Sequence, residues 1–363
     1  MQRHHRTPTG TARQQSRTRL AVALVSTALL LAACSSGAGG GTTTVGATPD
    51  ATADRAGAPE PVVPSTWPLT GVASDELVNR PALAVKIENS REARPQTGLE
   101  AADVVWEEVV EGGVTRYIAV YHSQQPEVVG PIRSVRPMDA HIIAPLVGLM
   151  VFSGGQPPFV DAVTASGLQV VSNDRGDAGF ARSSDRRAPH NVYGTLAEFT
   201  AQADAEHLNS PAEQFAFASD AESASTAAGT PAANLSVRMS GYSSPSWAWD
   251  EASGRYLRSE GTTPAVSVTG EQLGATSVVV LSVDIFNTEF VDPAGTPVPE
   301  TQVIGTGEAL VVSGGKSVPA TWSKESSSAP TTLTGADGQP VRLAPGNTWV
   351  ELVPSDGGSF SVS

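Results

Sequence analysis

The sequence predicts an α/β or α+β N-terminal domain followed by an all-β C-terminal domain of sandwich or barrel type. Three observations predict this order. The chain has 363 residues, more than one typical domain needs. Strand and helix patterns alternate up to about residue 215, as in mixed α/β structure. After about residue 234, only short strand patterns separated by turn signals remain, which indicates all-β structure.

The N-terminus predicts a signal peptide over residues 1–33. Five arginines and no acid precede the apolar run LAVALVSTALLL, which ends at Leu31. Small residues follow, and then comes Cys34, the only cysteine of the chain. This is the order of an export signal, and the run is short for a transmembrane anchor, the alternative. LLAAC resembles a bacterial lipobox, whose cysteine receives diacylglycerol. We therefore expect a lipid-anchored protein on the extracytoplasmic face of the bacterial cell membrane.

The charge of the expected mature chain excludes several partners. Without residues 1–33, the chain keeps 18 basic and 37 acidic residues, a net charge of −19. Such a protein does not bind nucleic acid or an anionic membrane by bulk charge. Its predicted contact with the bilayer is the lipid on Cys34. Residues 34–66 are rich in Gly, Thr, Ala and Pro, without an aromatic residue, so they are predicted to be a flexible tether.

The first domain is predicted over residues 67–215. ALAVKIEN, residues 82–89, alternates apolar and polar side chains, which is typical of a half-buried strand. ADVVWEEVVEGGVTRYIAVYH, residues 102–122, predicts a β-hairpin whose turn is Gly112–Gly113. LMVFSGG, residues 149–155, predicts a buried strand that ends in a glycine loop. A short helix and another strand follow this loop.

A helix is predicted to begin at Pro137. Proline suits the first helical position, and Asp139 would complement the helix dipole in the first turn. Met138, Ile142 and Leu146 recur at four-residue spacing and predict one buried face.

Residues 216–234, with the sequence SDAESASTAAGTPAAN at 219–234, predict a linker or mobile loop. Short strand patterns such as SWAWD, RYLRS and SVVVLSV follow it, separated by turn signals. The second domain is therefore predicted over residues 235–363.

Several long motifs resemble the YerB-like lipoproteins, whose two-part body is a domain of unknown function. In the first half these are NRPALAVKIENSREARPQTGLEAADVVWEEVVEGGVTRYIAVYHS and VGPIRSVRP. In the second half they are WAWDEASGRYLRSEG, GTGEAL, ATWSK and APGNTWVELVP. The resemblance spans about residues 67–354 and implies a lipid-anchored extracytoplasmic protein, with no established reaction. Many relatives carry a histidine before the SGG loop, where this chain has Phe152 or Ser153, so a role for that histidine would fail here.

The candidate ligand-binding residues centre on VVGPIRSVRPMDAHI. Arg133 and Arg136 precede the predicted helix, where guanidinium groups beside free helix N–H groups suit a carboxylate or phosphate. Strand alternation predicts that Glu107 and Glu111 share one face of the hairpin and that Glu108 takes the other. Arg116 is a further candidate, as a cross-strand partner for Glu111. Gly154 and Gly155 would allow close approach of a ligand, and Asn191 offers a side-chain amide.

The site leaves three functions open. The first is a non-catalytic binding or scaffold protein of the cell envelope, whose arginine-lined cleft takes a cell-wall component or an envelope protein. The alternative is a wall-acting hydrolase or lyase with Glu107 or Glu111 as acid/base and His190 assisting, which fits a glycosidase mechanism only if two carboxylates are suitably separated. The third is an assembly factor whose arginines form internal ion pairs, and this pairing is slightly favoured over ligand binding.

Motifs that identify a metal site, a hydrolase or a phosphate-binding loop do not occur in the sequence. It has no Cys/His metal cluster, no G-x-S-x-G, no H-E-x-x-H and no phosphate-binding loop. We therefore predict no metal and no cofactor, and the patterns leave open whether the protein is an enzyme.

Overall fold

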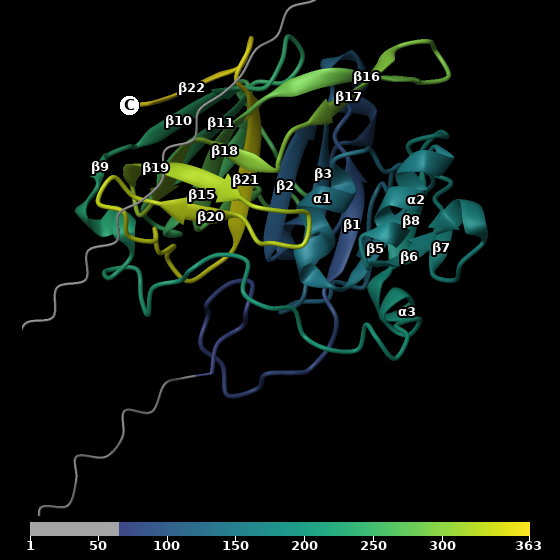
Figure 1. The fold of residues 1–363 in the computed structure, drawn as a ribbon, viewed down its shortest axis with the longest axis horizontal. Helices are drawn as coiled ribbons and strands as arrows, with labels where there is room; N and C mark the ends of the chain where they lie inside the picture. Colours follow the sequence, from purple (N-terminus) through teal and green to yellow (C-terminus); the bar gives the residue numbers. More distant parts are fainter. Residues whose placement is uncertain (1–64) are drawn as a thin grey trace, which may run out of the picture. The chain divides into compact units, whose positions relative to one another are not determined.

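One long sheet crosses both predicted domains (Figure 1). The structure, a computed structural model, describes residues 65–363. The predicted signal peptide, Cys34 and nearly all of the predicted tether lie outside the described residues. The 11-stranded sheet contains, in spatial order, β20 (Thr332–Thr334), β19 (Lys316–Lys324), β18 (Gly305–Ser313), β15 (Ser277–Val283), β21 (Thr348–Pro354), β2 (Val104–Val109), β3 (Thr115–Tyr121), β1 (Leu83–Glu88), β5 (Leu149–Phe152) and β6 (Gln169–Ser172), with β9 (Thr230–Pro231) beside β19.

The two predicted domains meet where β2 pairs in parallel with β21. The second region is rich in strands, as expected, and β15 and β18 to β21 extend the sheet of the first region while the sheet of β10 to β12 packs against them. Residues 65–363 form one compact unit. The boundary at residues 216–234 stays a prediction of the sequence; this stretch holds a 3-10 helix, Ser225–Ala228, and strand β9.

Three smaller sheets surround the long one. The largest contains β13 (Thr263–Pro264), β12 (Arg255–Glu260), β11 (Pro245–Asp250), β10 (Asn234–Arg238) and β22 (Ser359–Val362), with β14 (Gly274–Ala275) beside β12. A hairpin is formed by β16 (Ile285–Val291) and β17 (Pro297–Thr301), and the last sheet contains β4 (Val128–Val129), β8 (Val192–Thr195) and β7 (Phe180–Arg182).

The long sheet separates two hydrophobic cores. On one face, α1 (Asp139–Ile143) and α2 (Pro157–Ala165) pack in the core that contains Trp106 and Ile118. Figure 1 shows α1 in front of β1 and β3. On the other face, α3 (Leu196–Thr200) and the sheet of β10 to β12 pack in the core that contains Tyr117 and Trp349. In the described chain, none of the helices has the length and apolar composition needed to span a membrane.

The first predicted elements appear with small shifts. β2 and β3 form the expected hairpin, and Gly112 and Gly113 have φ of 68° and 76° in its turn. The helix begins at Asp139 instead of Pro137. The reason is that the Asp139 carboxylate accepts a hydrogen bond from the Arg136 backbone N–H, at 2.8 Å, and closes a turn there. Met138, Ile142 and Leu146 are buried, as predicted.

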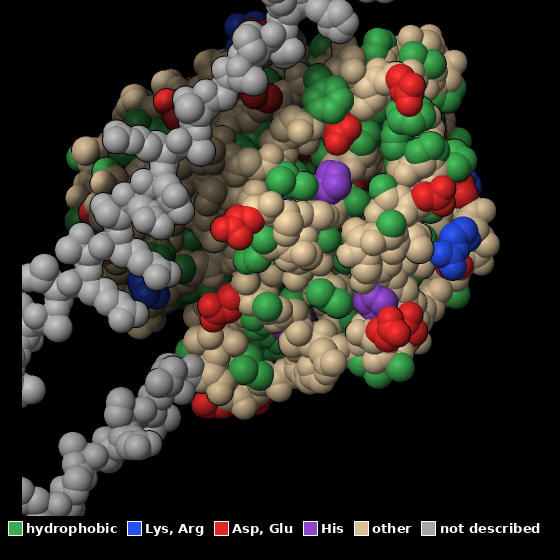
Figure 2. All heavy atoms as spheres, in the orientation of Figure 1, with side chains coloured by type: hydrophobic (Ala, Val, Ile, Leu, Met, Phe, Trp, Pro, Cys, Tyr) green, Lys and Arg blue, Asp and Glu red, His purple; other side chains and the backbone are tan. Residues whose placement is uncertain are grey.

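Acidic side chains are scattered over the face drawn in Figure 2, and basic side chains are few there. The full sequence has a net charge of −14, so a gathering of arginines stands out on this molecule. Arginine side chains are grouped at two places near the carboxyl ends of the parallel strands of the long sheet.

Candidate functional site

Charged side chains collect at the carboxyl ends of parallel strands in the long sheet. β1 and β2 both pair antiparallel with β3 and therefore run the same way, and β5, β6, β15 and β21 share this direction. Carboxyl ends of parallel strands are the usual place for ligands in such sheets. Here they carry Glu88 on β1, Glu107 and Glu108 on β2, and Glu351 on β21.

Strand alternation divides these residues between the two faces. Glu108 and Glu88 both lie opposite Arg116 in the register, so these three side chains share the face of α1. Glu107 lies opposite Tyr117 and Glu351, so it points to the other face. Two polar clusters follow, which we name the Lys86 cluster and the Arg258 cluster.

The Lys86 cluster consists of Lys86, Glu108 and Asp139, whose side chains are fully buried. The Lys86 ammonium contacts the Glu108 carboxylate and lies 2.8 Å from Asp139 Oδ1. Burial raises the pKa of Glu108 to about 8; the nearby charge of Asp139 adds to this rise, and Lys86 opposes it. Because one buried cation lies between two carboxyl groups, the arrangement of lowest energy is one in which these two carboxyl groups share a proton.

The two arginines of the predicted ligand site form ion pairs with glutamates of the same body. Arg133 Nε lies 3.4 Å from Glu88 Oε1, and Arg136 Nη2 lies 2.6 Å from Glu111 Oε1. Glu111 does not share a face with Glu107: it lies in the hairpin turn, on the side of Arg136. The expected grouping of Glu107 with Glu111 is therefore wrong, because the strand ends at Val109 and alternation stops there.

Arg116 also departs from its predicted pairing with Glu111. Its Nη1 donates to the backbone oxygen of Ser134, at 2.8 Å. Burial lowers the pKa of Arg116 to about 9, and the charge of Arg136 adds to this effect. Arg116 therefore supports the segment that carries the two arginines.

The SGG loop meets the arginine segment through its backbone. Val135 N–H donates to the Gly154 carbonyl at 3.0 Å, and Ser153 N–H donates to the Arg133 carbonyl at 2.9 Å. A Cβ at Gly154 would lie 1.8 Å from Asp174 Oδ2, and one at Gly155 would lie 2.7 Å from Val135 Cγ2. Both glycines allow close packing of protein against protein at these positions.

The structure brings His190 to the arginine segment but not Asn191. His190 Nδ1 lies 2.8 Å from Glu88 Oε1, the oxygen that Arg133 also approaches. Asn191 accepts from Arg182 at 2.8 Å and donates to the Ser183 carbonyl, which ties it to β7 and its flank. Asn191 is a buried structural residue in this arrangement.

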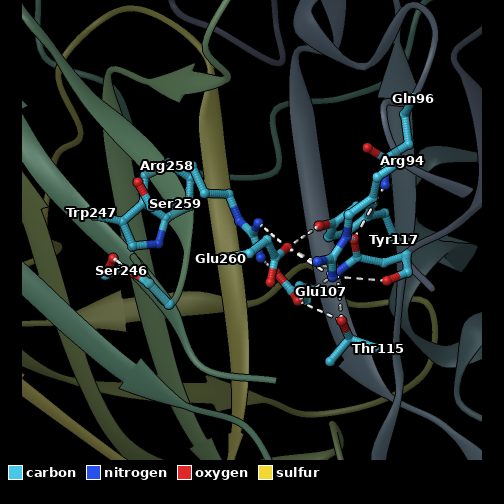
Figure 3. Close-up of polar contacts among 12 residues, drawn as sticks. Arg94, Gln96, Glu107, Thr115, Tyr117, Ser246, Trp247, Arg258, Ser259 and Glu260 are labelled. Carbon is cyan, nitrogen blue, oxygen red and sulfur yellow. Dashed lines mark hydrogen bonds and ion pairs between the residues drawn. The ribbon is translucent and has the colours of Figure 1, made fainter. Parts of the chain in front are cut away.

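The Arg258 cluster lies on the other face and joins both regions (Figure 3). Arg258 on β12 is fully buried; its Nη2 lies 2.7 Å from Glu107 Oε2, and its Nη1 contacts Glu260. Its guanidinium carbon lies 5.1 to 5.8 Å from three ring centroids, those of Trp349, Tyr117 and Trp247. This is cation–π packing on several sides of one cation.

Glu351 completes the Arg258 cluster as a neutral acid. Burial raises its pKa well above the usual range, and the charge of Glu107 raises it further. Its Oε1 accepts from Trp247 Nε1 at 3.0 Å. Burial also pushes the pKa of Glu260 upward, but Arg258 and Arg94 outweigh it, and the net pKa is lowered. Glu107 and Glu260 are the two carboxyl groups that pair with Arg258.

Arg94 connects the Arg258 cluster to the surface. Its Nη2 lies 3.1 Å from Glu260 Oε1, and its Nε donates to Asn89 Oδ1 at 2.9 Å. Sequence reasoning missed Arg94, Arg258 and Glu260. A signal was present in RYLRSE, because Tyr256, Arg258 and Glu260 alternate onto one strand face, and a core tyrosine marks that face as buried.

Three adjoining hollows follow residues Ser90–Pro95, and we name them together the groove. The first lies on the Arg258 side, has a volume of about 560 Å³, and is lined by residues that include Arg94, Tyr117 and Glu260. The second shares Arg91, Arg94 and Tyr242 with the first. The third shares Glu92 with the second and is lined by His190. The His190–Glu88 contact and the Arg258 cluster therefore both reach the lining of these hollows.

The pair proposed for acid/base chemistry does not meet in this groove. Glu107 is fully buried and accepts from Thr115 Oγ1 at 2.7 Å, besides its pair with Arg258. His190 contacts Glu88 on the opposite face. Among residues 65–363, no group of three or more His, Cys, Asp or Glu side chains is arranged to bind a metal ion.

Comparisons with known proteins agree with the two-part sequence. The N-terminal domain model of the protein family of unknown function DUF3048 matches residues 69–209, and its C-terminal domain model matches residues 235–350. The putative lipoprotein YerB of Bacillus subtilis (strain 168) is 34% identical over 128 residues, which are 35% of this chain and 39% of YerB. This match thus spans about two fifths of that relative's length.

The fold also has a solved counterpart. The crystal structure of YerB protein from Bacillus subtilis superposes with a TM-score of 0.70 at 23% identity, covering 82% of this chain and 99% of that one. This likeness shows a shared fold. Since both domain models match in the same chain and in order, the protein belongs to the two-part DUF3048 family of YerB-like proteins.

Proposed function

We propose that this protein is a lipid-anchored binding protein of the bacterial cell envelope and that the groove is its ligand site. The observation that carries the proposal is the convergence of the Glu88–His190–Arg133 contacts and the Arg258 cluster on one surface. Ordered charged side chains beneath a concave surface are typical of binding sites. The two regions each supply one wall, Arg91–Gln96 on one side and Tyr242–Val266 on the other.

The charge of the groove supports an anionic or mixed-charge ligand. Arg91 and Arg187 are exposed on it and take part in none of the ion pairs formed within residues 65–363. Unlike Arg133 and Arg136, these two guanidinium groups have no carboxylate partner among the described residues. Guanidinium groups are suited to carboxylates and phosphates.

The groove and the first described residues lie at opposite ends of β1. Trp67, near the start of the described chain, packs against His122, with 5.1 Å between ring centroids. His122 follows Tyr121, which lies opposite Leu83 at the amino end of β1. The groove lies at the carboxyl end of the same strand. A six-residue strand separates its ends by about 20 Å.

The anchoring part of the proposal rests on Cys34 and on the relative described as a putative lipoprotein. Replacing Cys34→Ser is expected to move the protein from the membrane fraction to the soluble extracytoplasmic fraction. Metabolic labelling with a fatty acid should disappear in the same variant. Labelling that persists in Cys34→Ser would contradict anchoring at this residue.

Binding is tested with the Cys34→Ser chain and soluble fragments of peptidoglycan. Titration calorimetry should show binding, and Arg91→Ala with Arg187→Ala should weaken it roughly tenfold through loss of charge-assisted hydrogen bonds. The matched control is Arg175→Ala with Arg342→Ala, which removes the same charge from residues that do not line the groove. An unmodified groove that binds no fragment, or equal losses in both double variants, contradicts the proposal.

A further inference from the structure

Tyr242 is the most exposed large hydrophobic side chain in the described chain. Its exposed fraction is 81%, and it lies in the turn between β10 and β11. It lines two of the three hollows of the groove, the first with Arg94 and Glu260 and the second with Asn89 and Thr115. Tyr242 therefore stands between two hollows and faces both.

The turn that carries Tyr242 is fixed. Ser240 Oγ donates to the Gly113 carbonyl and accepts from the backbone N–H groups of Tyr242 and Ser243, at 2.9 and 3.1 Å. Gly113 has φ of 76°, and a Cβ there would lie 3.2 Å from Ser240 Oγ. The glycine turn of the hairpin thus allows the close approach that holds this second turn. An aromatic ring on a rigid turn binds with little loss of side-chain entropy.

The other aromatic residues near the groove serve the core. Trp247 is 1% exposed and packs edge-on against Trp349, with 5.2 Å between centroids. Trp249 packs against Tyr256, with 5.3 Å between centroids. Tyr242 makes no aromatic pair of this kind among residues 65–363. Its exposed face is open to a ligand.

We propose, resting on the binding function above, that Tyr242 is a stacking platform and that the ligand is a saccharide chain. A pyranose ring has a flat face of C–H groups and an edge of hydroxyl groups. The tyrosine ring offers a flat apolar face, and the partly accessible side chains of Arg94 and Glu260 offer a donor and an acceptor to the hydroxyl edge. Hollows on both sides of Tyr242 accommodate a chain that continues past the ring.

The charges of the groove refine the ligand class. Arg91 lines both hollows next to Tyr242 and is exposed. A saccharide that carries a carboxylate substituent would place sugar on Tyr242 and the carboxylate near Arg91. A peptide ligand is the competing class, because tyrosine and arginine also serve peptide interfaces, and the experiment separates the two.

The test uses the Cys34→Ser chain with two probes: peptide-free glycan strands, prepared by amidase digestion of peptidoglycan, and the released stem peptides. Glycan strands should bind. Tyr242→Ala should weaken this binding roughly tenfold, whereas Tyr242→Phe should stay within about twofold, because the ring remains. Phe286→Ala is the matched control, an exposed aromatic outside the groove, and should bind as the parent does.

Two results overturn the saccharide assignment. One is binding of stem peptides without binding of glycan strands, which leaves the proposed binding function standing with another ligand class. The other is unchanged glycan binding by Tyr242→Ala, which removes the platform. If intact peptidoglycan fragments and both probes fail to bind the parent chain, the proposed function itself is wrong. Melting temperatures should be equal for all variants, since Tyr242 is exposed.

Discussion

The two faces of the long sheet differ in how a buried cation is paired with carboxyl groups. Each buries a cation between carboxylates at the same strand ends. The Lys86 cluster uses β1, β2 and α1, which lie within 61 residues of sequence, Leu83–Ile143. The Arg258 cluster uses β2, β12 and β21, which come from both matched domains. One cluster holds a local segment, and the other joins two halves of the protein.

The choice of cation fits these two roles. Lysine presents a compact ammonium that suits a small pocket between two acids. Arginine presents a planar group that stacks on aromatic rings and donates in several directions at once. Arg258 uses both properties, since three rings surround it and Glu107 and Glu260 take separate nitrogens. The Arg258 cluster should therefore be the more sensitive to substitution.

The largest effect is expected for Arg258→Met. This change leaves Glu107 buried without its cation, and it should lower the free energy of unfolding by about 3–5 kcal/mol. Urea denaturation at neutral pH measures it. Adding Glu107→Gln should recover part of the loss, because the uncompensated charge is then absent. A single variant as stable as the parent would show that the cluster does not join the two regions.

Lys86→Met should cost less, about 2–3 kcal/mol in the free energy of unfolding. The reason is that Glu108, whose pKa is already raised to about 8 by burial, can take up a proton when Lys86 is gone. The same denaturation experiment compares it with Arg258→Met. A larger loss for Lys86→Met than for Arg258→Met would reverse the ranking of the two clusters.

The sequence predicted the local parts of this arrangement and missed the long-range ones. The β2–β3 hairpin and the buried face of Met138, Ile142 and Leu146 are set by nearby residues, so their pattern was sufficient. The contact of Arg258 with Glu107 depends on the packing of the sheet that contains β12 against one face of the long sheet. The contact of Glu351 depends on the pairing of β2 with β21, more than 200 residues later, and no local pattern specifies such neighbours. The face of Glu111 was predicted wrongly because β2 ends at Val109 and the alternation of side chains does not continue beyond a strand end.

The pH dependence of stability should report on the buried carboxyl groups of both clusters. Glu108 has a folded pKa of about 8 against an ordinary value of 4.5, so the folded state binds the extra proton between these values. Stability contributed by this group is present below about pH 4.5 and is lost as pH rises towards 8. At about 1.36 kcal/mol per pKa unit, the expected loss between pH 5 and 8 is about 3–4 kcal/mol, since the pKa of about 8 already includes the opposing effect of Lys86. Glu108→Gln should flatten this part of the profile.

The comparison for the Glu108 profile is Glu351→Gln. Glu351 is buried with its pKa raised well above the usual range, so between pH 5 and 8 the folded state holds a proton that the unfolded state has released, and Glu351→Gln should also flatten the profile. Urea midpoints measured at several pH values give both slopes. Equal slopes for the parent and Glu108→Gln would show that folding does not raise the pKa of Glu108.

The smallest effect is expected for Arg133→Ala. This variant decides whether Arg133 binds a ligand or only forms an ion pair with Glu88. Its ion pair with Glu88 is partly exposed, with 22% of the Arg133 side chain accessible, so its loss should cost less than about 1 kcal/mol. Binding of peptidoglycan fragments should stay within about twofold of the parent, because Glu88 keeps His190 as a neighbour and the groove arginines Arg91 and Arg187 are unchanged. Calorimetry and melting temperature measure the two quantities. Binding that disappears at unchanged melting temperature would move the ligand site from the groove to the arginine segment, and the Lys86 face would then be the functional one.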